Sequence, residues 1–186
     1  MKNKRYSKDK KQLLSILKNL SFKKQHVILA SGKTSDYYFD GRISSLSSQG
    51  AYLMAKIILD MIKNDKITAI GGLTLGADPI IGATVAISCK TGTPINGFIV
   101  RKNEKKHGMQ KIIEGPELKK SSKVLIIDDV VTTGSSTIQA IEAVKKIGCK
   151  ISRVIAIVDR CEGATENIAK TGCKLESIFT IEDFNI

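Results

Sequence analysis

The amino-terminal part of the chain alternates helical and strand-like patterns. Apolar residues recur at helical spacing from Ser7, a candidate N-cap, to Leu20. The stretch HVILASGKTSDYYFDGR (26–42) is rich in β-branched and aromatic residues around a Ser-Gly pair, so it predicts two short strands joined at Gly32. An amphipathic helix is predicted next, over 47–65.

From residue 66 short apolar runs alternate with amphipathic stretches. The runs predict strands at 66–72, 94–100, 122–128 and 152–160, and the stretches between them predict helices at 76–92 and 134–149. Pro79 suits a first helical turn, and Lys145, Lys146 and Gly148 suit a helix end. The run Val124 to Ile127 is apolar at every position, which is typical of a parallel strand that is covered on both faces.

This alternation predicts an α/β fold with an open, doubly wound, parallel sheet. No repeat or linker divides the chain, so we expect a single domain over 1–186. Its first 45 residues or so would form a helix and a small hood, and roughly 66–160 would form the core sheet. In such folds ligands bind at the carboxyl ends of the strands.

Composition adds the class of protein. The 186 residues are 42% hydrophobic and 26% charged, as in soluble globular proteins. No stretch approaches 18 consecutive apolar residues, and the four cysteines have no zinc-ligand spacing. We therefore expect a cytoplasmic protein with reduced thiols and no membrane partner.

The charge changes the expected ligand. With 30 Lys and Arg against 18 Asp and Glu, the net charge is +12, which favours an anionic partner. Solvated lysines alone could also explain it. A phosphorylated small molecule and a nucleic acid both remain open at this point.

The sequence VLIIDDVVTTGSS (124–136) indicates which anion. Asp128 and Asp129 follow the apolar run, so we expect them at the strand's carboxyl end, and Gly134 opens the next helix. Hydroxyls surround that helix start, at Thr132, Thr133, Ser135 and Ser136. Free N–H groups and the positive end of a helix dipole bind phosphate, whereas carboxylates accept hydrogen bonds from sugar hydroxyls or hold hydrated Mg²⁺. The stretch therefore predicts a ribose 5-phosphate site, and no Walker A or G-x-G-x-x-G motif supports a P-loop or dinucleotide alternative.

The same stretch resembles the phosphoribosyl pyrophosphate (PRPP) motif of the type I phosphoribosyltransferases. The resemblance implies that Asp128 and Asp129 bind the ribose hydroxyls, that residues 132–136 surround the 5-phosphate, and that Val130 and Val131 belong to the PRPP site. It also implies Mg²⁺, bound mainly through PRPP and pyrophosphate.

A basic stretch, RKNEKKHGMQKIIEG (101–115), resembles the catalytic loop of the orotate phosphoribosyltransferases. The resemblance assigns catalytic contacts with pyrophosphate to Arg101, Lys102, Lys105 and His107. It also implies a homodimer, because in that family the loop reaches into the neighbouring subunit's site.

Further segments match the same family on the side of the base. The resemblance places Tyr38 and Phe39 beside the pyrimidine, sets Arg160 against the carboxylate of orotate and adds Thr132 to the orotate contacts. His26 is predicted to precede a strand and to be structural.

Two positions depart from the pattern of some family members: Ala30 replaces one lysine, and Gly76 lies near a missing Tyr-Lys pair. Whether Lys33 or Lys90 compensates is open at this stage.

The expected reaction is orotate plus PRPP giving orotidine 5′-monophosphate and pyrophosphate. Two alternatives share features of this sequence. A nucleic-acid-binding regulator on this fold is supported by the +12 charge, but the sequence contains no recognised RNA- or DNA-reading motif. A purine-using relative would share the PRPP motif, but the 101–115 loop and Arg160 argue against it.

Overall fold

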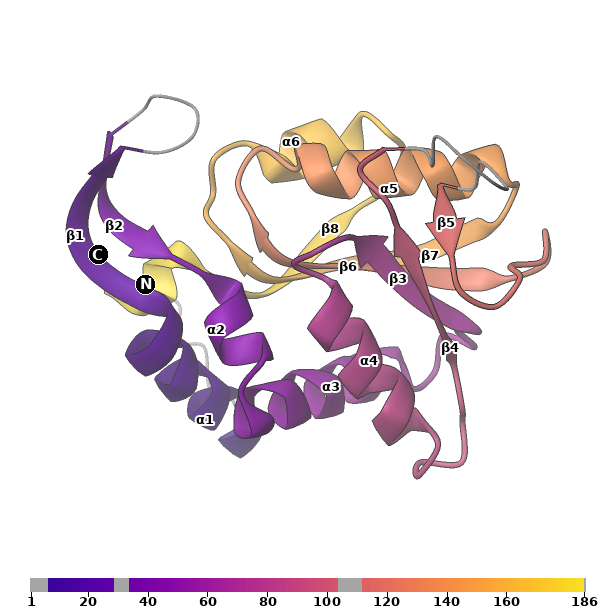
Figure 1. Ribbon diagram of the computed structural model, residues 1–186, viewed down its shortest axis with the longest axis horizontal. Helices are drawn as coiled ribbons and strands as arrows, with labels where there is room; N and C mark the ends of the chain where they lie inside the picture. The colour runs from indigo at the N-terminus through magenta and orange to yellow at the C-terminus, as the bar shows by residue number, and fades with distance from the viewer. Residues whose placement is uncertain (1–6, 29–33, 104–111, 186) are drawn as a thin grey trace.

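The computed structural model describes residues 7–28, 34–103 and 112–185 (Figure 1). Its strands are β1 (Phe22–Ile28), β2 (Thr34–Phe39), β3 (Ala69–Leu73), β4 (Asn96–Val100), β5 (Ile113–Glu114), β6 (Lys123–Val131), β7 (Lys150–Asp159) and β8 (Leu175–Thr180). Its helices are α1 (Lys8–Ile16), the π-helical turn η1 (Leu17–Ser21), α2 (Gly41–Ser45), α3 (Ser48–Ile62), α4 (Asp78–Ser88), α5 (Ser135–Lys146), α6 (Ala164–Ala169) and the 3₁₀ turn η2 (Ile181–Phe184). Among them, no helix is long and apolar enough to cross a membrane.

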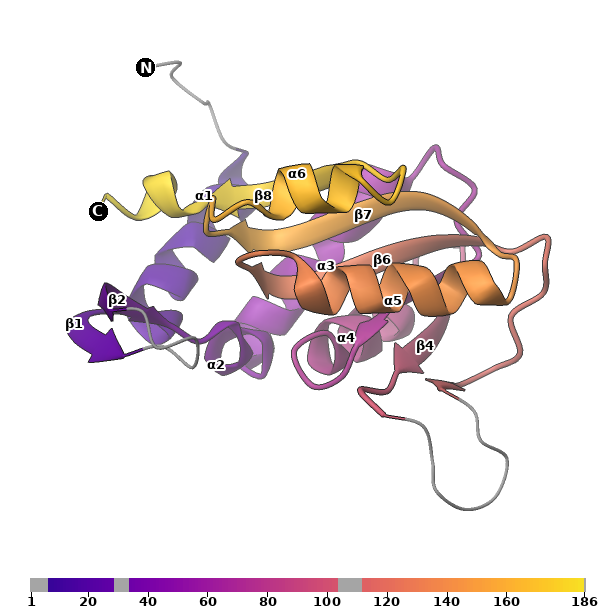
Figure 2. The same ribbon diagram turned by 90° about the horizontal axis from the view of Figure 1, so that it is seen from above.

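The central sheet has six strands in the order β5-β4-β3-β6-β7-β8. All neighbours are parallel except β5, which runs antiparallel to β4. Helices α5 and α6 cover one face, and α3 and α4 cover the other (Figures 1 and 2). This arrangement confirms the predicted doubly wound α/β fold.

The core consists of two apolar layers separated by the sheet, and β6 contributes to both. Leu125 and Ile127 belong to the layer that contains α3 and α4, whereas Val124 and Ile126 belong to the layer with α5. All four side chains are fully buried. Successive strand residues point to opposite faces, so only an uninterrupted apolar run fills both layers. Each buried side chain of this size stabilises the fold by roughly 1.5–3 kcal/mol.

A two-stranded hairpin, β1–β2, forms the hood beside the sheet (Figure 1). Aromatic rings attach it to the carboxyl-terminal turn. Phe22 lies 5.6 Å from Phe184 between ring centroids, and Phe39 meets the same ring edge-on at 5.2 Å. Such pairs each contribute about 0.5–1.5 kcal/mol beyond the area they bury. The hood is therefore held in place by contacts far apart in the sequence.

Most predicted elements are confirmed, and several details differ. Ser7 caps α1, as expected, by accepting a hydrogen bond from the Lys10 N–H. However, β6 continues to Val131, so the two aspartates lie inside the strand rather than after it. His26 lies within β1 rather than before it, exposed and 3.0 Å from Asp36. The sheet also extends beyond residue 160, because β8 pairs with β7.

Candidate active site

A cavity of about 210 Å³ opens at the carboxyl ends of β3 and β6, where the fold predicts a ligand. We call it the site cavity. It is lined by residues from α2, the β3–α4 loop, the end of β4, β6 and the start of α5, namely Arg42, Leu73, Thr74, Leu75, Gly76, Lys102, Asp128, Asp129, Val130 and Ser136. The chain thus brings segments that are nearly 100 residues apart in the sequence around the two predicted aspartates.

Next to the site cavity, residues 132–136 form the phosphate loop, which leads from β6 into α5. It borders a hollow of about 50 Å³ together with Asp128, Val130 and Val131. Gly134 has a left-handed backbone (φ 81°), a conformation that residues with a side chain rarely adopt. As the N-cap of α5 it has no side chain to cap the first N–H groups of the helix. Thr133, Ser135 and Ser136 are exposed. Free N–H groups, hydroxyls and the positive end of a 12-residue helix suit a phosphate group.

The two valines between the aspartates and the phosphate loop are predominantly packing residues. The Val131 side chain is buried in the layer with α5, and Val130 packs partly against the opposite layer. They keep the phosphate loop in place and leave mainly their backbone for ligand contact.

The paired carboxylates are held by the protein itself. Asp128 is buried and accepts hydrogen bonds from the Thr137 hydroxyl at 2.8 Å and from the Asp129 N–H at 3.0 Å. Asp129 accepts one from the Val130 N–H at 2.9 Å. Burial, and then the neighbouring charge of Asp129, raises the pKa of Asp128 to about 7. Burial also raises the pKa of Asp129. The ionised form of each carboxylate is therefore unfavourable unless a ligand donates hydrogen bonds to it.

Two glycines approach Asp129 so closely that no side chain fits. A Cβ at Gly76 would lie 2.3 Å from Oδ1, and one at Gly41 would lie 2.6 Å from Oδ2. A larger residue at Gly76, one of the two positions that depart from the family pattern, would displace this carboxylate. Lys90 does not compensate, since it follows the far end of α4, about 16 Å of helix away. Ala30 and Lys33 lie outside the described residues.

Cations line the site from two sides. Lys102, a predicted pyrophosphate contact, borders the site cavity together with Arg42, which was not predicted from the sequence. Arg42 donates to Asp40 twice, at 2.9 and 2.8 Å, and this pairing lowers the pKa of Asp40. Arg101 lies in an adjoining cavity of about 410 Å³, 3.5 Å from Glu114.

Of the predicted pyrophosphate contacts, Lys105 and His107 lie outside the described residues. Lys102 lines the site cavity and the adjoining cavity, and Arg101 lines only the adjoining one. The position of Arg42 could have been suspected only from its place directly after Asp40 and Gly41 in the predicted hood.

The predicted base side is built around Arg160, immediately after β7. Its N–H donates to the Val131 carbonyl at 2.9 Å, so its backbone is joined to the end of β6. Its side chain is only 8% exposed and donates from Nε to the Tyr37 hydroxyl at 3.0 Å. Tyr38 is partly exposed, as a contact with a base requires. Phe39 is buried in the core, so the structure does not bring it to Arg160; its neighbour Tyr37 makes that contact.

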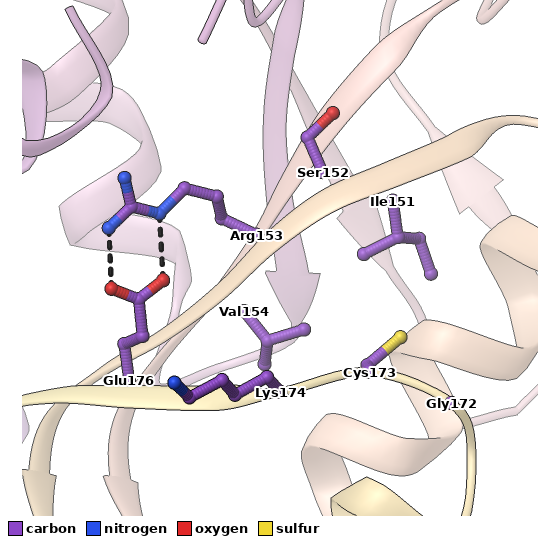
Figure 3. Close-up of a pocket in the computed structure, with 8 residues that line it drawn as sticks. All are labelled: Ile151, Ser152, Arg153, Val154, Gly172, Cys173, Lys174 and Glu176. Atoms are coloured by element: carbon purple, nitrogen blue, oxygen red, sulfur yellow. Dashed lines mark hydrogen bonds and ion pairs between the residues drawn. The ribbon is translucent and has the colours of Figure 1, made fainter. Parts of the chain in front are cut away.

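A further cavity lies at the opposite edge of the sheet, by the amino ends of β7 and β8 (Figure 3). It measures about 280 Å³. Its main charged group is Arg153, which donates to Glu176 and to Asp65, each at 2.8 Å. These partners join β7, β8 and the end of α3. The cavity's only arginine is therefore committed to structure, and the site lies at the other edge.

Comparison with known proteins points to one family. The model of the phosphoribosyl transferase domain matches residues 45–185. The orotate phosphoribosyltransferase of Nostoc sp. is 40% identical over 94% of this chain and 84% of its own. The chain belongs to the orotate phosphoribosyltransferase family.

Solved structures of this family share the fold. The orotate phosphoribosyltransferase of Mycobacterium tuberculosis H37Rv, in complex with Fe(III) dicitrate, superposes with a TM-score of 0.84 at 36% identity, over 96% of this chain and 99% of that one. A structure of the same enzyme in complex with PRPP gives a TM-score of 0.80 at 32% identity, over the same shares. The family assignment therefore covers both the sequence and the arrangement of the elements that carry the site.

Proposed function

We propose that this member of the family transfers the phosphoribosyl group of PRPP to orotate, which gives orotidine 5′-monophosphate and pyrophosphate for pyrimidine nucleotide synthesis. Residues 1–186 would act as one phosphoribosyltransferase domain. The observation that carries the proposal is the juxtaposition of the phosphate loop with the buried carboxylate of Asp128 and the half-buried one of Asp129 at one edge of the sheet. The relative from M. tuberculosis that has been solved with PRPP supports the same ligand.

The residues divide by the part of PRPP or orotate that they suit. The 5-phosphate binds the phosphate loop at the start of α5, and Asp128 and Asp129 accept hydrogen bonds from the ribose hydroxyls. Lys102 and Arg42 line the site cavity, which supports a role for both in binding the pyrophosphate. Arg101, Lys105 and His107 remain predicted pyrophosphate contacts, and Thr132, Tyr38 and Arg160 remain predicted orotate contacts.

The chemistry requires positioning more than a strong base. A ring nitrogen of anionic orotate forms the new bond to C1′ while the bond from C1′ to pyrophosphate breaks. Positive charge develops on the ribose and negative charge on the leaving group. Holding both reactants in line can contribute up to roughly 7–11 kcal/mol. Each charge-assisted contact to the leaving group adds about 1.5–3 kcal/mol if it is made only in the transition state.

The site suits Mg²⁺ that arrives with the substrate. In the ranges 7–28, 34–103 and 112–185, no group of three or more His, Cys, Asp or Glu side chains is placed to hold a metal ion. Phosphate oxygens are preferred Mg²⁺ ligands, and the carboxylates of Asp128 and Asp129 can accept from water molecules of the ion. When bound, Mg²⁺ neutralises charge on the pyrophosphate.

A homodimer and a cytoplasmic location complete the proposal. Large apolar side chains are exposed on α2, at the start of α3 and in the β3–α4 loop, at Ile43, Leu46, Tyr52 and Leu75. These side chains support a second copy that covers them, and the resemblance to the family's catalytic loop implies that residues 101–115 of one subunit complete the neighbouring site. Leu46→Lys should then shift the mass in analytical ultracentrifugation from dimer to monomer. An unchanged dimer would place the interface elsewhere.

The base assignment is tested by substrate choice. Purified protein with PRPP and Mg²⁺ is offered orotate, uracil, adenine or hypoxanthine, and products are separated by chromatography. Orotidine 5′-monophosphate alone is expected. A purine nucleotide as the main product would retain PRPP as the ligand but overturn orotate as its acceptor.

A further inference from the structure

Tyr37 has no role in the proposed function, yet it makes two contacts with Arg160. It lies on β2, and its hydroxyl accepts the Arg160 Nε–H at 3.0 Å. Its ring also faces the guanidinium, whose central carbon lies 4.6 Å from the ring centroid. The two residues are 123 positions apart, so the hood hairpin must fold against β7 before the contact exists.

The contacts of Arg160 are on one side of its guanidinium. Glu162 Oε1 lies 2.8 Å from the same Nε that bonds Tyr37. Among the described residues, the side-chain hydrogen bond of Arg160 is made at Nε and none is made by its two terminal nitrogens, neither of which is fully enclosed. Their parallel N–H groups form the fork that binds a carboxylate through two hydrogen bonds. The structure therefore anchors the inner end of the guanidinium and leaves its outer end for a ligand.

Anchoring matters because an arginine side chain loses considerable rotamer freedom when it binds. A phenol that stacks on the guanidinium and accepts from Nε removes that freedom before the ligand arrives. Burial raises the pKa of the Tyr37 phenol, so the hydroxyl is neutral at physiological pH. A neutral oxygen accepts the hydrogen bond from Nε and does not compete with the carboxylate of a ligand for the charge of the guanidinium.

We propose that Tyr37 is a positioning residue, which holds Arg160 so that its two terminal nitrogens face the carboxylate of the pyrimidine acid. Through Arg160, the hood then sets the preference for a base that carries a carboxylate. The inference rests on the proposed function, in which Arg160 contacts orotate.

The test uses Tyr37→Phe, which removes the hydroxyl and keeps the ring, and Tyr37→Leu, which removes both. Steady-state kinetics are measured with each substrate varied. Tyr37→Phe should raise the KM for orotate roughly 3- to 10-fold and leave the KM for PRPP within about 2-fold, as expected for one hydrogen bond. Tyr37→Leu should raise the orotate KM further. Glu142→Gln, an exposed change on α5, is the matched control and should change neither.

A double-mutant cycle separates positioning from a general structural role. If Tyr37 acts through Arg160, then Tyr37→Phe has no further effect in an Arg160→Ala background. The same fold-change in both backgrounds, or an equal rise in both KM values, would overturn the inference. So would an unchanged orotate KM in Tyr37→Phe.

Orotate binding measured by calorimetry distinguishes the two proposals. Wild-type protein that binds orotate without turnover would refute the proposed function, and weaker binding in Tyr37→Phe would still support the role of Tyr37. Wild-type protein that neither binds nor converts orotate would overturn both.

Discussion

In the site cavity, the backbone of Gly76 lies so close to the Asp129 carboxylate that we expect Gly76→Ala to impair the use of PRPP. A Cβ at this position would lie 2.3 Å from Oδ1, 2.9 Å from Cγ and 3.2 Å from Oδ2 of the carboxylate. The carboxylate has little room to move, because Oδ1 accepts from the Val130 N–H and Gly41 lies against Oδ2. The added methyl group must therefore displace the Asp129 side chain or the loop.

The size of the effect follows from what Asp129 does in the proposed mechanism. Hydrogen bonds to a charged group contribute about 1.5–3 kcal/mol. Loss of the contact with a ribose hydroxyl should then lower kcat/KM for PRPP by roughly 10- to 150-fold. The KM for orotate should change less, since Arg160 and its neighbours are not displaced.

The assay is initial-rate kinetics with PRPP varied at saturating orotate, and thermal unfolding verifies that the variant is folded. Gly82→Ala is the matched control, because no atom lies within 4 Å of a Cβ at that position on α4. It should retain activity and gain about 0.5–1 kcal/mol in the free energy of unfolding. Gly76→Ala with wild-type kcat/KM for PRPP would refute the role assigned to Asp129.

Three further changes test other parts of the account. The pKa of Asp128 is raised from 3.8 to about 7, so between these pH values the folded wild-type protein binds more protons than the unfolded chain. The free energy of unfolding of the wild type therefore falls as pH rises through this window. Asp128→Asn removes the acid and with it this contribution. Urea unfolding at several pH values should show a shallower fall in the variant, and parallel profiles would contradict this. Arg160→Ala should raise the orotate KM by roughly 10- to 150-fold with nearly unchanged PRPP binding, and equal weakening of both ligands in calorimetry would remove it from the base side. Arg153→Met, at the cavity of Figure 3, should lower the free energy of unfolding by about 1.5–3 kcal/mol, because Asp65 and Glu176 lose their partner. The kcat of this variant should not fall. A loss of activity in the folded variant would show that this edge of the sheet affects the site.

The fold was predictable from sequence where the pattern of apolar residues leaves no choice. A short apolar run such as Val124–Ile127, between turn residues, is typical of a strand that is covered on both faces, and all four side chains are buried. The end of β6 was not predictable, because aspartate is rare in strands, and its place there depends on Thr137, nine residues later, which donates to Asp128. Likewise β8 shows no regular alternation of buried and half-buried residues, and its strand forms because β7 offers an edge.

The site divides in the same way. The stretch from Asp128 to Ser136 is contiguous and combines carboxylates, hydroxyls and a helix start, so its chemistry is legible in the sequence. Tyr37, Arg42 and Gly76 come from other segments and enter the site only through the packing of the hood, α2 and the β3–α4 loop. Alternation along β2 turns Tyr37 and Phe39 towards the protein and Tyr38, between them, towards solvent. Position along the strand then decides that Tyr37 meets Arg160 while Phe39 enters the core.

The most direct measurement of the central claim is the ultraviolet absorbance of orotate over time, with purified protein, PRPP and Mg²⁺. Parallel cuvettes lack PRPP, lack Mg²⁺, or contain Asp129→Asn in place of the wild type. The account predicts a fall in absorbance that requires both PRPP and Mg²⁺ and is strongly slowed in the variant. No fall with folded wild-type protein would contradict transfer to orotate, and a fall of equal rate in Asp129→Asn would contradict the site described here.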